Sequence, residues 1–221
     1  MDSVFLSVND LACARNNLLL FEKLSFELRP GNILLLEGAN GSGKTSLLRL
    51  LTGLATPELG TILWRGQGLS SVRYEYGQSL TYIGHAPGLK TGLSADENLS
   101  WLAPGFDGKQ RYHALALAGL QGQEDVLCAR LSAGQQRRVA LARLYLEATP
   151  LWILDEPFTA LDKASVKSLE ALLAGHSQRG GMVILTSHQD LVIDGVTVRS
   201  LQLENFAPEN PEILSELSGN S

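Results

Sequence analysis

The sequence predicts an α/β fold with a mostly parallel sheet, flanking helices and an antiparallel β edge. Three observations lead to this class. Continuous apolar runs such as ILLLE (33–37) and MVILTSH (182–188) are typical of strands buried in a parallel sheet. Leucines at helical spacing follow the first of these runs. Weakly alternating segments near the N-terminus predict the antiparallel strands.

The first third of the chain contains at least five predicted elements before the next long helical region. Residues 3–8 predict a strand, and residues 18–28 predict one or two more before the turn at Pro30-Gly31. The buried run 33–37 leads into TSLLRLLTGL (45–54), which has the leucine spacing of a helix. A turn at 56–60 then precedes a strand at 61–66.

The rest of the chain predicts further strands and a helical subdomain. LTYIGHAPG (80–88) is a short strand running into a loop, and residues 88–128 are mainly helical, with Ser94 and Glu97 forming a capping box. LWILDEP (151–157) and MVILTSH are two more buried strands. Asp162 is expected to cap a helix over 163–174 that ends at Gly175. We therefore expect a single domain over 1–204, a helical subdomain at about 87–140, and a loose tail over 205–221.

Composition narrows the class of protein. The 221 residues are 44% hydrophobic, which supplies a packed core, and the net charge is −5. An acidic balance argues against a general nucleic-acid partner. Cys13 and Cys128 have no metal-ligand spacing, which is typical of reduced thiols in the cytosol. Neither a signal peptide nor a membrane-spanning run is evident, so the chain is expected to be cytosolic or held at a membrane by partners.

Four predicted strands end in polar residues. The ends fall at Glu37, Gly84, Asp155 and His188. In open α/β sheets, ligands bind outside the carboxyl ends of the strands. The segments GANGSGKT, GHAPG, DEP and SH are therefore expected to converge on one ligand.

The segment Gly38-Ala39-Asn40-Gly41-Ser42-Gly43-Lys44-Thr45 fits the phosphate-loop pattern GxxxxGK[ST]. Its glycines let the backbone curl so that N–H groups surround phosphates. Lys44 supplies a charge between the β- and γ-phosphates, and the Thr45 hydroxyl suits Mg²⁺. A strand before the segment and a helix after it support this interpretation.

Two acidic residues and one histidine extend the predicted site. Asp155 and Glu156 follow an apolar strand, so one carboxylate can hold Mg²⁺ through water while the other polarises an attacking water. His188 could donate a hydrogen bond to the γ-phosphate. Each residue alone is also compatible with a solvated strand end, and the phosphate loop favours the functional interpretation.

The segment ARLSAGQQRRVALARLYL (129–146) predicts a second anion site. Ser132 and Gln135 fit a capping box, and a helix N-terminus fronted by Ser and Gly presents free N–H groups. The chain already has a phosphate cradle, so a second chain could use this site in trans and close a nucleotide sandwich.

Together, these motifs resemble the nucleotide-binding subunits of ABC transporters. The resemblance is carried by LSAGQ (131–135), LDEP (154–157), ALD (160–162) and TSH (186–188), in this order after GANGSGKT, and it covers about residues 3–204. It implies a P-loop ATPase core, the ABC ATPase fold, ATP as substrate and Mg²⁺ as cofactor. It also implies hydrolysis of ATP by a head-to-tail dimer that moves membrane-spanning subunits.

The resemblance also implies a role for each residue of this chain that matches a family motif. The resemblance implies that Lys44 and the backbone of 40–43 bind the β- and γ-phosphates, and that Ser46 lies near the α-phosphate. Thr45 and Asp155 would hold Mg²⁺, Glu156 would be the general base and His188 would sense the γ-phosphate. The residues implied to act at or across the dimer interface are Ser132, Gly134, Gln135 and Asp162.

Two positions depart from the family pattern. ABC subunits generally carry Gln where this chain has His85, in the loop that links hydrolysis to the membrane subunit. The aromatic that stacks on adenine falls near Arg15, whose planar guanidinium can also stack on a base, with Phe21 as a rival.

A second resemblance, to one subfamily of these ATPases, indicates which membrane complex the chain is expected to join. LTYIGHAPGLKTGLSADENLSW (80–101) and the compact length resemble the ATP-binding subunits of cytochrome c maturation systems, the haem-exporter ATPases. This implies a peripheral place on the cytoplasmic face of the inner membrane and haem handled indirectly by the complex, either exported or released on a chaperone. The alternatives are a subunit of another small ABC transporter for lipid, drug or ion, and a soluble ABC ATPase that acts on ribosomes or nucleic acid.

Overall fold

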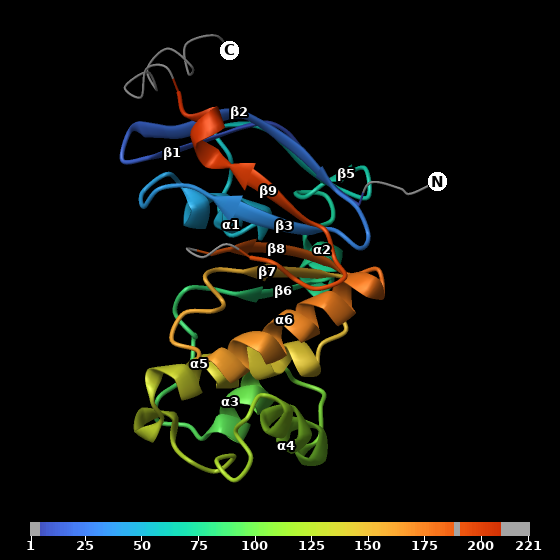
Figure 1. Ribbon diagram of the computed structural model, residues 1–221. Helices are drawn as coiled ribbons and strands as arrows, with labels where there is room; N and C mark the ends of the chain where they lie inside the picture. The colour runs from blue at the N-terminus through green and yellow to red at the C-terminus, as the bar shows by residue number, and fades with distance from the viewer. Residues whose placement is uncertain (1–4, 188–190, 209–221) are drawn as a thin grey trace.

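The strands of the chain form two sheets, as the computed structural model shows for residues 5–187 and 191–208 (Figure 1). The five-stranded sheet is parallel, in the order β6 (Leu80–Ile83), β7 (Leu151–Leu154), β8 (Met182–Thr186), β3 (Ile33–Glu37) and β9 (Val198–Gln202). The four-stranded sheet is antiparallel, in the order β2 (Leu18–Leu28), β1 (Leu6–Arg15), β4 (Leu59–Trp64) and β5 (Gln67–Gly68). The predicted α/β class is confirmed, with the antiparallel strands in a sheet of their own.

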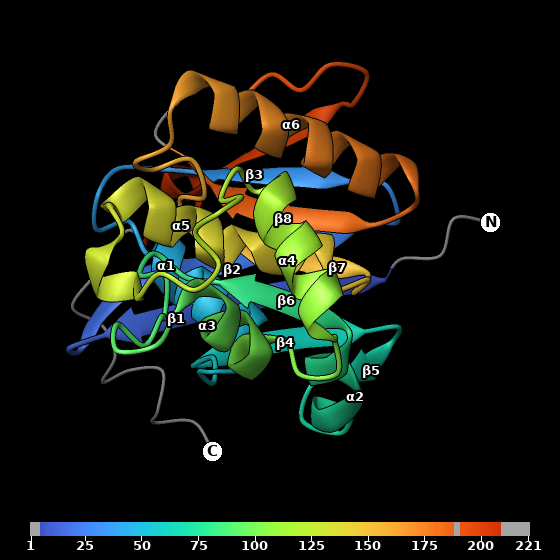
Figure 2. The same cartoon turned by 90° about the horizontal axis from the view of Figure 1, so that it is seen from below.

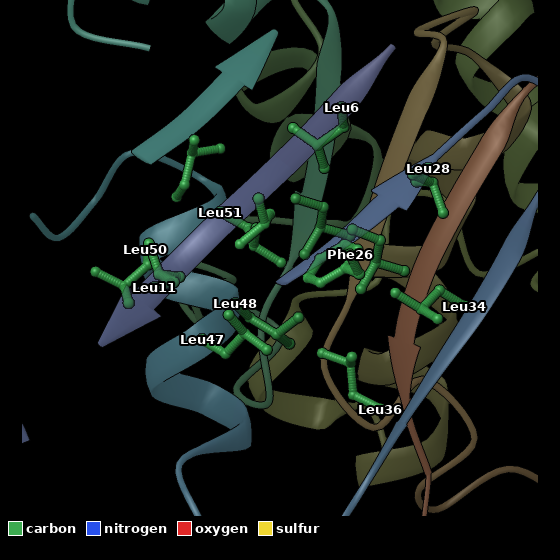
Figure 3. Close-up of a cluster of buried hydrophobic side chains, with 14 of the residues drawn as sticks. Leu6, Leu11, Phe26, Leu28, Leu34, Leu36, Leu47, Leu48, Leu50 and Leu51 are labelled. Atoms are coloured by element: carbon green, nitrogen blue, oxygen red, sulfur yellow. The ribbon is translucent and has the colours of Figure 1, made fainter. Parts of the chain in front are cut away.

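The main core lies between the two sheets, around helix α1 (Lys44–Leu51) (Figure 3). Leu47, Leu48 and Leu51 pack there against Leu34 and Leu36 of β3 and against leucines of β1 and β2. Alternation along β3 sends Ile33 and Leu35 into a different cluster on the opposite face. Both faces of β3 are buried, as its continuous apolar run predicts.

The opposite face of the parallel sheet is covered by α6 (Lys163–Gln178) and α5 (Ala133–Leu141) (Figures 1 and 2). Leu169 and Leu173 of α6 are buried against the strands, as is Leu141 of α5. The 3-10 turn η2 (Ala142–Tyr145) continues α5 and adds Leu144 to this cluster. Helix α5 begins within LSAGQ (131–135), the signature segment, and the N-cap of α6 is Asp162 of ALD (160–162), the D-loop.

Helices α3 (Ala95–Leu102) and α4 (Gly108–Leu117) lie beyond α5 and share a third cluster (Figure 1). This cluster includes Leu99, Leu115 and Val139, together with the free thiol of Cys128 in the 3-10 turn η1 (Cys128–Arg130). Helix α3 begins at the predicted capping box: Ser94 accepts from the Glu97 N–H and the Glu97 carboxylate accepts from the Ser94 N–H. The Ser94 prediction is therefore confirmed.

The predicted ends of β1 and α6 were wrong, and the bounds of α1 and β4 differ by up to three residues from the predicted 45–54 and 61–66. β1 extends to Arg15 instead of ending at residue 8, because shifts in register after Val8, with Asp10 at φ +47°, break the alternation that marks a strand. Helix α6 passes through Gly175 and ends at Gln178. A glycine costs a helix only about 1 kcal/mol, and the buried Ser177, which donates to the Gly31 carbonyl at 2.6 Å, stabilises the last turn.

Other elements carry no clear sequence signal. Helix α2 (Arg73–Gln78) and strand β9 were not predicted. The 3-10 turn η3 (Leu203–Phe206) contains Asn205, the expected start of the tail, and residues 209–221 lie outside the described part of the chain.

Candidate nucleotide-binding and catalytic site

The phosphate loop connects β3 to α1, at the carboxyl edge of the parallel sheet. Gly41 (φ +89°) and Gly43 (φ +102°) take left-handed conformations. A Cβ atom on Gly43 would lie 3.1 Å from the Phe21 ring, so both the backbone angle and the space require glycine there. Gly43 is the N-cap of α1 and provides no side-chain cap, which leaves the N–H groups of the first turn available to an anion.

Two side chains inside the loop have the chemistry of phosphate ligands. The buried Lys44 ammonium donates to the Gly38 carbonyl and, at 3.1 Å, to the Ala39 carbonyl. The buried Ser42 hydroxyl has no hydrogen-bond partner in the described part of the chain. An anion in the loop would satisfy both groups, so the donor set fits a bound phosphate chain.

Asp155 lies at the centre of a hydrogen-bonded cluster that joins three strand ends. Its Oδ2 accepts from the Thr45 hydroxyl at 3.0 Å, and its Oδ1 accepts from the buried Thr186 hydroxyl at 2.8 Å. Thr186 in turn accepts from the Glu156 N–H at 2.8 Å. The phosphate-loop segment after β3, the acidic pair after β7 and the end of β8 therefore meet, as predicted, while their convergence on one ligand stays a prediction. Thr45 and Asp155 present adjacent oxygen atoms of the kind that Mg²⁺ prefers.

Glu156 follows in a left-handed turn, with φ +50°. Its side chain is 19% exposed, and Oε2 accepts from the Thr159 hydroxyl at 3.3 Å. His85, from the loop after β6, places Nδ1 3.5 Å from the same oxygen. The loop at the end of β6, the remaining one of the four predicted strands, therefore also reaches the site, because His85 contacts the carboxylate of Glu156, the predicted general base.

The signature residues have local structural roles. Ser132 and Gln135 form the predicted capping box at the start of α5, and the Gln135 amide also donates to Gln123 at 2.9 Å. A Cβ on Gly134 would lie 2.4 Å from the Ala160 carbonyl oxygen, so α5 packs directly on the D-loop backbone. These hydrogen bonds of the Ser132 and Gln135 side chains stay within the helical part of the chain. Ser132 itself is exposed.

Three further predicted residues lie at the borders of the site. Asp162 caps α6 by accepting from the Ser165 N–H at 2.8 Å, and this hydrogen bond lowers the pKa of the Asp162 carboxyl. Arg15 is exposed at the end of β1. Phe21, the rival position, is fully buried, and stacking of adenine on Arg15 stays a prediction. Ser46 lies in the first turn of α1, and His188 lies outside the described residues.

Sequence reasoning missed three residues that hold the site together. Thr186 stood within the TSH motif but was given no role. Glu204, from η3, accepts a hydrogen bond from the Ala39 N–H of the phosphate loop, and this bond lowers the pKa of its carboxyl. Arg137 is a buried guanidinium whose pKa is lowered by burial. The sequence shows Arg137 only as one of several basic residues on a helix.

Comparison with known proteins places these features in a family context. Residues 21–159 match the sequence model of the ABC transporter family. The chain is 51% identical to the cytochrome c biogenesis ATP-binding export protein CcmA of Pseudomonas fluorescens (strain Pf0-1), over 94% of this chain and 100% of that protein. It is 54% identical to cytochrome c biogenesis ATP-binding export protein CcmA 1 of Salmonella paratyphi A, over 90% of this chain and 96% of that protein.

Solved structures show the same fold. An ATP-binding subunit of an ABC transporter superposes with a TM-score of 0.73 at 26% identity, covering 83% of this chain and 79% of that chain. An ATP-binding cassette in a dimeric post-hydrolysis state, bound to ADP and Pi, superposes with a TM-score of 0.73 at 20% identity, covering 83% and 88%. The second likeness is evidence of the fold alone.

Proposed function

Because this chain belongs to the ABC transporter family and, within it, to the cytochrome c biogenesis ATP-binding export proteins, we propose that it drives haem handling for cytochrome c assembly. It is an ATP-hydrolysing subunit with the ABC ATPase fold. The observation that carries the proposal is identity above 50% over nearly the whole length of proteins named as cytochrome c biogenesis ATP-binding export proteins. The cluster of Thr45, Asp155 and Thr186 beside the phosphate loop supports the chemistry.

ATP would be held through its phosphates. The N–H groups of residues 40–43 and the Lys44 ammonium would surround the β- and γ-phosphates, with Ser46 near the α-phosphate. Lys44 would exchange its two loop carbonyls for phosphate oxygens. Arg15 would stack on the adenine through its guanidinium plane. Mg²⁺, when bound by Thr45 and by Asp155 through water, neutralises charge on the phosphates.

Hydrolysis would then depend on Glu156 as general base. The Glu156 carboxylate accepts a proton from a water that attacks the γ-phosphorus, and the bond to the β-phosphate oxygen breaks to give ADP and phosphate. The Thr186 hydroxyl fixes the Glu156 N–H and the Asp155 carboxylate, so both acids are held in place before ATP arrives. His188 would donate to the γ-phosphate.

A second copy of the chain would complete each site. The start of α5 carries Ser132, Gly134 and Gln135, which would contact the nucleotide bound by the opposite subunit. The exposed N-cap of this helix is compatible with such a contact. Asp162, two residues after Ala160 and at the N-cap of α6, would link the two sites.

Membrane-spanning subunits would respond to the closing and reopening of the ATPase dimer. No helix in the described ranges, 5–187 and 191–208, is long and apolar enough to cross a membrane. The loop around 85–89 would couple hydrolysis to the partners. Trp101, 57% exposed, lies beside it with the Lys90 ammonium 4.0 Å from the ring centroid. We place the chain peripherally on the cytoplasmic face of the inner membrane, with haem handled indirectly and without a nucleic-acid partner.

Purification of tagged Glu156→Gln protein from its native membranes tests the proposal. ATP and a mild detergent are kept present, and mass spectrometry identifies what co-purifies. We expect polytopic membrane proteins together with a haem-handling chaperone. Co-purification of a different permease would be consistent with an ABC ATPase but would contradict the haem role. Co-purification of ribosomal proteins or nucleic acid, without a membrane protein, would contradict the membrane role.

A further inference from the structure

Arg137 is a charged side chain buried in the middle of the molecule. It lies on α5, two residues after the signature, and is 3% exposed. Its guanidinium donates to five backbone carbonyls, those of Gly84 (2.7 Å), His85 (3.3 Å), Asp155 (2.6 Å), Glu156 (2.9 Å) and Pro157 (3.4 Å). Within the described residues, no carboxylate forms an ion pair with it.

The five carbonyls belong to two segments that are far apart in sequence. Nη1 binds the loop after β6, at Gly84 and His85, whereas Nη2 and Nε bind the turn after β7 that carries the acidic pair. The guanidinium is planar and rigid, so it fixes the two segments relative to each other and to α5. One side chain thus connects the signature helix, the histidine loop and the catalytic turn of the same subunit.

The catalytic turn is the segment that most needs such support. Glu156 has a left-handed backbone conformation, which costs a non-glycine residue energy unless its surroundings hold it. Arg137 Nη2 binds the carbonyls on both sides of that strained position, those of Asp155 and Glu156. The guanidinium therefore helps to set the direction in which the Glu156 carboxylate leaves the backbone.

Packing alone does not account for a charge at this position. Burial lowers the pKa of Arg137, because the cation has left water, and the negative charges of the nearby Asp155 and Glu156 offset only part of this effect. An apolar side chain of similar size would avoid that cost. What the arginine contributes is its set of directed hydrogen bonds to two loops of the site.

We propose that Arg137 is a positioning residue for ATP hydrolysis, which locks the general-base turn and the coupling loop to the signature helix. Movement of α5, when a second chain closes on the nucleotide, then moves Glu156 and His85 together. The inference rests on the proposed function, because it assigns a role within the same hydrolytic cycle.

The test compares Arg137→Gln and Arg137→Lys with Arg138→Gln. Arg138 is the next residue of α5 and donates to the Gly119 carbonyl at 3.1 Å, away from both segments, so its variant controls for the loss of charge. The measurements are kcat and KM for ATP, the ATP-dependent dimer in a Glu156→Gln background, and amide hydrogen exchange.

We expect kcat of Arg137→Gln to fall about 100-fold, since a misplaced general base costs that much. KM should change less than about threefold, because the phosphate loop is untouched. Arg137→Lys keeps the charge but loses the planar set of guanidinium N–H donors. Its kcat should therefore remain about tenfold or more below that of the wild type. Amides of 84–86 and 155–158 should exchange faster, while those of β3 and α1 stay protected and the dimer still forms.

Three results would overturn the proposal. One is wild-type kcat in Arg137→Gln or Arg137→Lys. Another is a loss of protection throughout the chain in both variants, which would make Arg137 a residue of the core only. The last is an equal loss of kcat in Arg138→Gln. If the wild type itself does not hydrolyse ATP, the proposed function fails instead, so the two failures are distinguishable.

Discussion

The hydroxyl of Thr186 forms two hydrogen bonds to the acidic pair Asp155-Glu156, which we propose to act in ATP hydrolysis. It donates to Asp155 Oδ1 and accepts from the Glu156 N–H, each at 2.8 Å, and Thr186 is fully buried. Thr186→Val keeps the shape and the β-branched side chain but removes both bonds. The Asp155 carboxylate then loses a donor, and the Glu156 N–H loses its acceptor.

The expected cost follows from the chemistry of the two bonds. A hydrogen bond to a charged group contributes about 1.5–3 kcal/mol, and an unpaired buried N–H costs about 1–3 kcal/mol. Allowing for the partial exposure of Glu156, we expect unfolding free energy to fall by about 3 kcal/mol. For a chain of this length the midpoint of thermal unfolding then falls by about 6–12 °C. ATP turnover should fall about 100-fold, because the acids are no longer held in place.

Calorimetry and steady-state ATPase assays of wild type, Thr186→Val and Thr186→Ser would measure these effects. Serine keeps both hydrogen bonds and loses one methyl group, so it should cost about 1 kcal/mol and preserve most of the turnover. A valine variant that matches the wild type in midpoint and turnover would refute this reasoning. A serine variant as impaired as valine would show that the methyl contact, not the hydroxyl, matters.

Three further predictions concern helices α5 and α6. Ser132→Arg should abolish turnover while the monomer keeps its affinity for ATP through Lys44; calorimetric titration showing lost affinity would contradict action in trans. Gly134→Ala should lower unfolding free energy by about 1–3 kcal/mol, because its Cβ would meet the Ala160 carbonyl oxygen at 2.4 Å, and an unchanged denaturation midpoint would disprove that contact. Burial lowers the pKa of His176 from its ordinary 6.5 to about 4. The unfolded chain therefore binds the proton first, and stability that is full above pH 6.5 should fall by about 1 kcal/mol per unit towards pH 4. When measured by denaturant unfolding, the unfolding free energy of His176→Phe should depend less on pH than that of the wild type. An equal slope between pH 6.5 and pH 4 would exclude His176 as the cause of the pH dependence.

The sequence was informative where local chemistry decides the structure. Continuous apolar runs predicted β3, β7 and β8, since a strand buried on both faces needs no polar alternation. The phosphate loop and the capping boxes were predicted because glycines and N-cap residues act within a few neighbours. The polar residues at the ends of β3, β7 and β8 then indicated the edge of the sheet at which the site forms.

Sequence reasoning failed where distant contacts decide. β9 has a mixed, half-exposed pattern, and its place beside β3 makes it a strand. Gly175 did not end α6, because tertiary contacts of the last turn outweigh a small propensity cost. The roles of Arg137 and Glu204 depend on carbonyl and N–H groups far from them in the chain, so no spacing rule could have found them.

The mass of Glu156→Gln protein in solution, with and without ATP and Mg²⁺, tests the central claim most directly. The claim is that two copies of this chain close on ATP and that Glu156 carries the hydrolytic step. Light scattering coupled to size exclusion should show a monomer without nucleotide and a stable dimer with one ATP per chain, and adding Ser132→Arg should abolish the dimer. A variant that binds ATP yet stays monomeric, or that hydrolyses ATP at the wild-type rate, would contradict the account.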